Sequence, residues 1–163
     1  MEEMLWKACD ALRGSIEPSE YKHVVLSLIF LKYAGFHFEK RRQEIIAAGQ
    51  EAFVDNVAFY GAKNVFYLPE TARWSYIKEN AKQPDIALIV DKALADIEKK
   101  NKPLRGALPN NYYSSLGIES EKLGSLIDKA DGFDSILEND TENDIIGRVY
   151  EYFLSKFAIK EGK

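Results

Sequence analysis

Apolar residues recur along much of this chain at the spacing that places them on one face of an α-helix. The clearest run extends from Ile86 to Ile97, where an apolar side chain returns at every third or fourth position. Pro84 precedes this run, and Asn101 and Pro103 follow it, at places where a helix usually begins and ends. The pattern therefore predicts a helix between these residues and favours a mostly α fold.

A second stretch, residues 24–31, is apolar at every position except Ser27. A helix so apolar is normally buried on most of its circumference. Pro18 stands shortly before this stretch, and proline is tolerated in a first helical turn because its missing N–H would have no partner there. We therefore expect a central buried helix that begins near Pro18. Its expected C-terminal end carries three basic residues, Lys40, Arg41 and Arg42.

Weaker helical patterns occupy other parts of the chain, and two segments do not fit a helix. Further helices are predicted at 3–13, 49–58, 72–82, 120–131 and 141–157. The sequence NVFYL at 64–68 favours a short strand, and the segment 102–116, with its prolines, glycines and polar pairs, favours an ordered surface loop. The overall prediction is a single compact helical domain with irregular loops and at most a short strand pair.

The length and composition fit one globular domain. The chain has 163 residues, of which 46% are hydrophobic and 12% aromatic, which is enough for a core. Its longest apolar run is far shorter than the roughly 20 residues that span a bilayer. The acidic residues Glu2 and Glu3 do not suit a signal peptide, and the single Cys9 leaves no internal disulfide. We expect a soluble cytoplasmic protein without a membrane segment.

Net charge limits the ways in which this chain can bind nucleic acid. The chain has a formal net charge of −4, whereas DNA binding independent of sequence usually needs a strongly basic surface. Any DNA contact is therefore expected to be auxiliary. The structural alternative for the basic groups is a solvated face or, at a helix C-terminus, a favourable interaction with the helix dipole. The candidates for DNA contact are Lys99, Lys100, Lys102, Arg105, Lys40, Arg41, Arg42 and Arg73.

Residues 5–33 read LWKACDALRGSIEPSEYKHVVLSLIFLKY. This stretch resembles the opening helices of the modification subunit (M, or HsdM) of type I restriction-modification systems. The match includes polar residues that a hydrophobic pattern does not dictate. The segments 66–84, 123–127 and 147–157 are similar to later landmarks of the same domain. The resemblance covers nearly the whole chain, yet only the N-terminal third or so of the family's subunit.

The resemblance implies a helical N-terminal domain over 1–158, with 159–163 as the start of a linker to a C-terminal methyltransferase domain. In the family, that C-terminal part methylates adenine N6 with S-adenosylmethionine. The motifs for this chemistry do not occur here: no two glycines form a Gly-x-Gly turn, and NNYY at 110–113 lacks the prolines of the family's Asn-Pro-Pro-aromatic motif. We therefore expect no catalytic, cofactor-binding or metal-binding residue in this segment, and S-adenosylmethionine as the cofactor of the parent subunit.

The resemblance also implies partners. In the family, two modification subunits assemble with one specificity subunit, which reads the DNA sequence, and restriction subunits complete the enzyme. The N-terminal domain is expected to close over double-stranded DNA without enzymatic activity of its own. An alternative stays open: a free-standing helical protein-interaction or regulatory module would explain the acidic charge and the missing motifs equally well, although not the matched polar residues.

Overall fold

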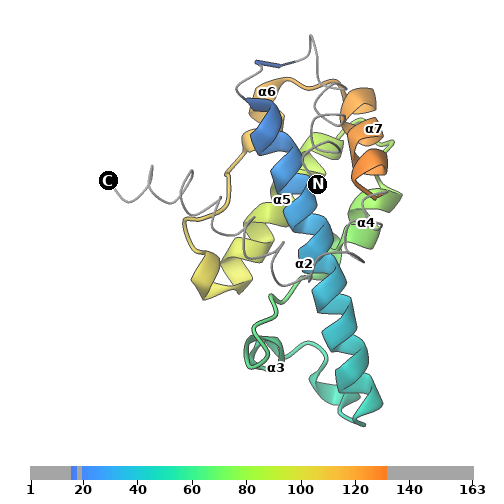
Figure 1. The fold of residues 1–163 in the computed structure, drawn as a ribbon, viewed down its shortest axis with the longest axis vertical. Coiled ribbons are helices and arrows are strands. Elements are labelled where there is room, and N and C mark those ends of the chain that lie inside the picture. Colours follow the sequence, from blue (N-terminus) through green and yellow to red (C-terminus); the bar gives the residue numbers. More distant parts are fainter. Residues whose placement is uncertain (1–15, 18–19, 132–163) are drawn as a thin grey trace.

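Helices make up every regular element in the part of the chain that the structure describes (Figure 1). This computed structural model describes residues 16–17 and 20–131. The α-helices are α2 (Tyr21–Ala47), α3 (Val57–Gly61), α4 (Trp74–Glu79), α5 (Ile86–Lys100), α6 (Tyr112–Leu116) and α7 (Ser120–Asp131). Short 3-10 helices lie between them: η2 (Glu51–Phe53), η3 (Glu70–Ala72) and η4 (Lys102–Leu104). The predicted mostly α fold is confirmed, and no helix in these residues is long and apolar enough to cross a membrane.

Helix α2 is the longest of these elements, and helices α4 and α7 pack against it. It has 27 residues, which corresponds to a length of about 40 Å. Every residue from Val24 to Ala34 is buried. The hydroxyl of the buried Ser27 donates a hydrogen bond to the His23 carbonyl at 2.8 Å, so this polar group is satisfied within the helix. The prediction of a central buried helix is confirmed.

The predicted end of this helix at Lys40–Arg42 is wrong, because α2 continues to Ala47. Residues 39–47 contain no glycine or proline that would stop a helix, and Ile45 is buried. The chain leaves the helix at Gly49, whose φ of 75° is a conformation that glycine adopts readily. The three basic residues therefore lie before the last turn of α2, where the helix dipole has little effect on them.

Helices α5 and α7 follow their predicted ranges and pack against each other. The predicted apolar face of α5 is buried at Ile86, Val90, Ala93, Leu94 and Ile97. Helix α7 also packs closely on the turn after α4. A Cβ atom added to Gly124 would lie under 3.0 Å from the Ala81 carbonyl oxygen. A single core therefore joins α2, α4, α5 and α7.

Two predicted helices differ from the structure because single residues adopt extended backbone conformations. The helix predicted at 49–58 is instead η2 followed by the start of α3. Asn56 separates them with φ −87° and ψ 110°, and its side chain accepts a hydrogen bond from the Ala58 N–H at 3.0 Å. The helix predicted at 72–82 begins only at Trp74, because Arg73 before it is extended, and it ends at Glu79.

The predicted strand at 64–68 is also wrong, since no strand occurs in the described residues. The backbone of Tyr67 pairs instead with the side chain of Asn101. The segment 102–116, predicted to be a loop, contains η4 and α6 within it. The predicted helices at 3–13 and 141–157, and the predicted boundary at residue 158, lie outside the described residues.

Candidate nucleic-acid interface

Four of the candidate residues, Lys99, Lys100, Lys102 and Arg105, lie together around the C-terminal end of α5 and η4. All four are exposed. Residues 99–118 contain these four basic side chains and no acidic one, in a chain whose net charge is −4. None of the four forms an ion pair with another residue that the structure describes. This stretch, which we call the α5-end basic segment, is therefore a local positive surface on an acidic chain.

A buried polar residue fixes the backbone beneath the α5-end basic segment. Asn101 lies between Lys100 and Lys102 and is buried. Its Nδ2 donates to the carbonyls of Tyr67 at 2.8 Å and Ile97 at 2.7 Å, and its Oδ1 accepts from the Tyr67 N–H at 2.9 Å. A buried amide with all these partners satisfied holds a single geometry. The lysines on either side of it therefore leave the protein from fixed positions.

Carboxylates hold both ends of the connection that follows α5. Glu98 Oε1 accepts a hydrogen bond from the Gly106 N–H at 2.9 Å and so closes the turn around η4. The buried carboxylate of Asp91 accepts from the N–H groups of Tyr113 at 2.8 Å and Ser114 at 2.9 Å, at the start of α6. These two carboxylates therefore order a loop whose exposed charged side chains are positive. Ordering a loop beforehand reduces the entropic cost of binding.

Tyr113 anchors α6 to the central helix. Its hydroxyl is buried and donates a hydrogen bond to the Val24 carbonyl of α2 at 2.5 Å. Burial raises the pKa of this hydroxyl well above its usual value, so the group keeps its proton and stays a donor at physiological pH. The last residue of the NNYY pattern at 110–113 is thus part of the packing of the domain.

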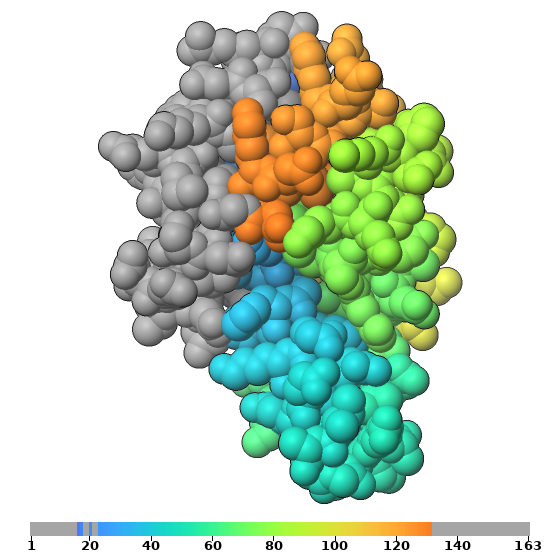
Figure 2. All heavy atoms as spheres, turned by 90° about the vertical axis from the view of Figure 1, so that its right-hand side faces the viewer, coloured from blue at the N-terminus to red at the C-terminus, as the bar shows by residue number. Residues whose placement is uncertain are grey.

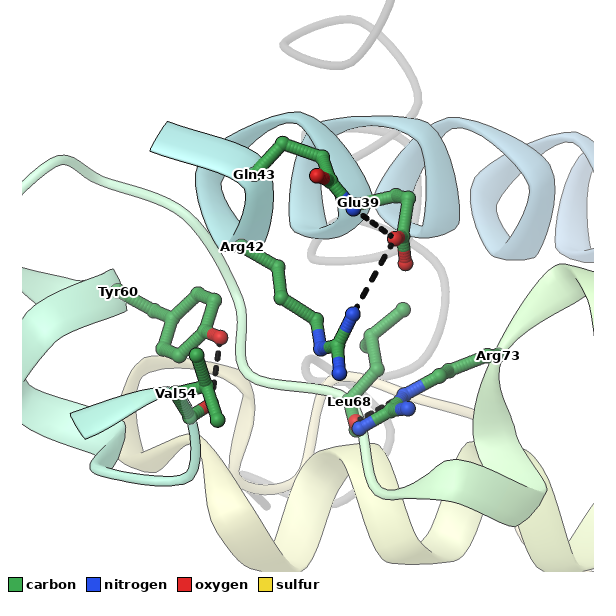
Figure 3. Close-up of polar contacts among 7 residues, drawn as sticks. All are labelled: Glu39, Arg42, Gln43, Val54, Tyr60, Leu68 and Arg73. Carbon is green, nitrogen blue, oxygen red and sulfur yellow. Dashed lines mark hydrogen bonds and ion pairs between the residues drawn. The ribbon is translucent and has the colours of Figure 1, made fainter. Parts of the chain in front are cut away.

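The candidates on α2 have a different environment from the α5-end basic segment. Lys40 is exposed. Arg41 Nε donates to the Phe59 carbonyl at 3.0 Å, and Arg41 Nη1 lies 3.5 Å from a Glu44 carboxylate oxygen. Arg42 Nη1 lies 3.7 Å from a carboxylate oxygen of Glu39 (Figure 3). Each of these two guanidinium groups therefore already has an acidic neighbour one turn away on the same helix.

Arg73 also makes contacts within the domain. Its Nε donates to the Leu68 carbonyl at 3.2 Å, and its guanidinium carbon lies 4.7 Å from the centre of the Phe38 ring. In Figure 3, Arg42 reaches down from α2 and Arg73 reaches in from the start of α4 toward the same region. These contacts attach the connection between α3 and α4 to the central helix.

Two tyrosines, one in α3 and one in the connection that follows it, make further contacts in this region. The Tyr60 ring stacks on Phe38 at 4.9 Å between ring centres, and the Tyr67 hydroxyl donates to Asp55 at 3.1 Å. Burial raises the pKa of Tyr60, although the charges of Arg42 and Arg73 act in the opposite direction. Sequence reasoning missed this role of the tyrosines and of Asn101. The available signal was Asn101 itself, an amide at a helix end between two lysines.

Within the described residues, no group of three or more His, Cys, Asp or Glu side chains is arranged to hold a metal ion. Among the eight candidate residues, those of the α5-end basic segment lie together and are exposed. Arg41, Arg42 and Arg73 make contacts within the domain. DNA contact by any of them stays a prediction.

Comparison with known proteins identifies the family. Residues 1–130 match the family described as the HsdM N-terminal domain. The chain belongs to this family. The type I restriction enzyme MjaIX methylase subunit of Methanocaldococcus jannaschii is 34% identical over 177 aligned positions, which cover 99% of this chain and 31% of that protein. The HindI methylase subunit of Haemophilus influenzae is 32% identical over 123 positions, covering 59% of this chain and 26% of that protein. The resemblance inferred from residues 5–33 is confirmed.

The chain spans less than a third of the length of either relative. The match to the HsdM N-terminal domain includes all eight candidate residues and stops at residue 130, in the last turn of α7. Helix α7 is fixed at this end by Lys32, a buried lysine of α2. Its Nζ donates to the carbonyls of Ala130 at 3.1 Å and Asp131 at 2.5 Å. The end of the matched region is therefore tied to the central helix.

The Asp131 side chain in this HsdM N-terminal domain has two further partners. Its carboxylate accepts a hydrogen bond from Trp74 Nε1 at 2.9 Å and pairs with Lys78 Nζ at 2.9 Å. Burial acts to raise the pKa of Asp131. The hydrogen bonds from Lys78 and Trp74, with the charges of Lys78 and Lys32, outweigh that effect and hold the pKa below its usual value.

Proposed function

We propose that this HsdM N-terminal domain is a non-catalytic part of a type I methylase subunit, and that it contacts the phosphate backbone of double-stranded DNA. The observation that supports the proposal is the α5-end basic segment: four exposed cations and no acidic residue within 99–118, on a backbone held by Asn101 and Glu98. Cations on an ordered loop bind phosphate oxygens without reading bases. The domain would thus help to enclose DNA rather than select its sequence.

The rest of the proposed mechanism follows from the family. Methyl transfer from S-adenosylmethionine to adenine N6 would take place in another part of the parent subunit. A specificity subunit would read the DNA sequence, and a second methylase subunit would complete the enclosure, with restriction subunits added in the full enzyme. The single helical core of residues 20–131 supports movement of this domain as one block, because packed cores deform little.

The test uses two variants of the parent subunit in its assembled complex. The first carries Lys99→Glu and Lys102→Glu in the α5-end basic segment. The matched control carries Lys129→Glu and Lys82→Glu. Lys129, like Lys99, is exposed in the last turn of a helix, and Lys82, like Lys102, is exposed shortly after the end of an α-helix. Both variants therefore change the net charge by the same amount, and each places one substitution in the last turn of a helix.

DNA affinity is then measured at several salt concentrations with cognate and non-cognate duplexes. We expect Lys99→Glu/Lys102→Glu to weaken binding to both duplexes similarly. The slope of log affinity against log salt should also fall by about one unit for each phosphate that the variant no longer neutralises. The control variant should change both quantities much less. Equal effects of the two variants, or none in either, would contradict the proposed DNA contact and leave the α5-end basic segment as a solvated surface.

A further inference from the structure

The segment that joins α2 to α3 exposes aromatic and aliphatic side chains. Phe53 of η2 is 44% exposed and Val57 at the start of α3 is 37% exposed. The Phe53 ring lies on the Phe59 ring in a nearly parallel stack, with 4.7 Å between ring centres and 5° between ring planes. We call Phe53, Val57 and Phe59 the η2–α3 patch. Figure 2 shows this part of the chain, in teal, at the narrow end of the described surface.

The η2–α3 patch is held in place from beneath. The Arg41 side chain of α2 donates to the Phe59 carbonyl at 3.0 Å. The Tyr60 hydroxyl, which belongs to a fully buried residue, donates to the Val54 carbonyl at 2.5 Å. Asn56 caps the start of α3. A rigid aromatic surface loses little conformational entropy on binding. The exposed Phe53 ring, supported by the partly buried Phe59, is therefore ready to contact a partner without rearrangement.

The acidic residues that flank Phe53 in the sequence are Glu51 and Asp55, and both are exposed. We call these two carboxylates the acidic rim of the patch. Glu44, the third acidic residue of 44–62, is paired with Arg41 and is not part of the rim. DNA is repelled by such a rim. A second copy of the same patch is also disfavoured, because a two-fold contact would bring the acidic rims of both copies together.

We propose that the η2–α3 patch is a docking surface for a different polypeptide of the assembled enzyme, one that presents aliphatic side chains flanked by lysine or arginine. The apolar centre and acidic rim together select this chemistry, since buried apolar anchors supply affinity and complementary charge supplies specificity. Two or three side chains are too few for a whole interface of standard size, which buries about 800 Å² on each partner. The patch therefore adds to a larger contact. This inference rests on the proposed assembly of the parent subunit and does not depend on the DNA contact.

The first test places a photo-crosslinker in the patch, within the parent subunit of the complete assembly. Phe53→p-benzoylphenylalanine keeps an aromatic ring at the exposed position. Leu88→p-benzoylphenylalanine is the matched control, because Leu88 is 60% exposed on α5 and lies outside the patch. After illumination of the complex bound to DNA, mass spectrometry identifies the attached molecule. We expect position 53 to join a different subunit at a peptide with basic and aliphatic residues, and the control to give far less product.

The second test measures assembly. Phe53→Ser/Val57→Ser should weaken binding of the parent subunit to the cross-linked partner by about tenfold, while Leu88→Ser leaves it unchanged. Glu51→Lys should also weaken binding, and more strongly at low salt. Circular dichroism checks that each variant keeps its helices, as expected for changes at exposed positions.

Three results would overturn the inference: cross-links to DNA, cross-links between two copies of the patch, or a yield at position 53 no higher than at position 88. Unchanged assembly of the Phe53→Ser/Val57→Ser variant would also overturn it and leave the proposed DNA contact untouched. If the wild-type parent subunit itself failed to assemble with other subunits, the proposed assembly and this inference would both be wrong.

Discussion

Replacement of Gly124 by alanine tests how closely α7 packs on the turn after α4. In the interior of an isolated helix, Gly→Ala stabilises by about 1 kcal/mol, because glycine loses more backbone entropy on folding. At this site, however, the new Cβ would lie under 3.0 Å from the Ala81 carbonyl oxygen and 3.3 Å from its carbon. A backbone carbonyl cannot rotate away as a side chain does, and overpacking of this kind costs about 1–3 kcal/mol. Set against the gain of about 1 kcal/mol from the helix, this cost leaves a net destabilisation of up to about 2 kcal/mol for Gly124→Ala.

Gly61→Ala is the matched control, since Gly61 is also helical and a Cβ there would meet nothing within 4 Å. Thermal unfolding followed by far-ultraviolet circular dichroism separates the two cases. A destabilisation of about 1 kcal/mol lowers Tm by about 2–4 °C in a chain of this size, so Gly124→Ala should melt lower than wild type and Gly61→Ala at the same temperature or higher. A Gly124→Ala variant at least as stable as wild type would show that the turn after α4 moves aside, and the reasoning would be refuted.

Two further predictions concern the core and the end of α7. Leu28→Asp should leave the domain unfolded or insoluble, because Leu28 is 0% exposed and an unpaired buried carboxylate costs several kcal/mol. The control Leu88→Asp, at an exposed site, should fold. A stable Leu28→Asp variant would contradict a core role for α2. Asp131 has a lowered pKa in the folded protein, so its ionised carboxylate stabilises the fold at pH values above its unfolded pKa, near 3.8. This contribution to stability disappears as the pH falls through the pKa of the folded protein. The Tm difference between wild type and Asp131→Asn should therefore be present at neutral pH and shrink in acid, and a difference independent of pH would count against the Asp131 contacts.

The parts of the fold that the sequence predicts well are those in which apolar periodicity decides the structure. The ranges of α5 and α7 and the burial of 24–31 follow directly from the apolar positions. The errors occur where one polar side chain decides the backbone. Asn56 interrupts the predicted helix at 49–58 through its own cap, and Asn101 takes the place of a partner strand for Tyr67. A periodicity argument contains no information about such a contact over 34 residues.

The candidate interface shows the same limit. Basic side chains are visible in the sequence, but whether they are exposed depends on partners that are distant in the chain. Arg41 bonds to Phe59, and Arg73 lies over Phe38, so these residues serve the packing of the domain. Lys99 and Lys102 have the same charge and are exposed, and the buried Asn101 between them makes the internal bonds. Residue type alone does not separate these two groups.

The distribution of charge along the chain connects the two proposals. The chain as a whole is acidic, yet residues 99–118 carry only positive charge and residues 44–62 only negative charge. Both segments are fixed to the connection between α3 and α4: Asn101 bonds to the Tyr67 backbone, and Asp55 accepts from the Tyr67 hydroxyl. A net charge averaged over the domain would hide this separation. One rigid domain can therefore present a positive surface to DNA and a negative, partly apolar surface to a basic polypeptide, because each interaction depends on charges within about one Debye length, roughly 8–10 Å.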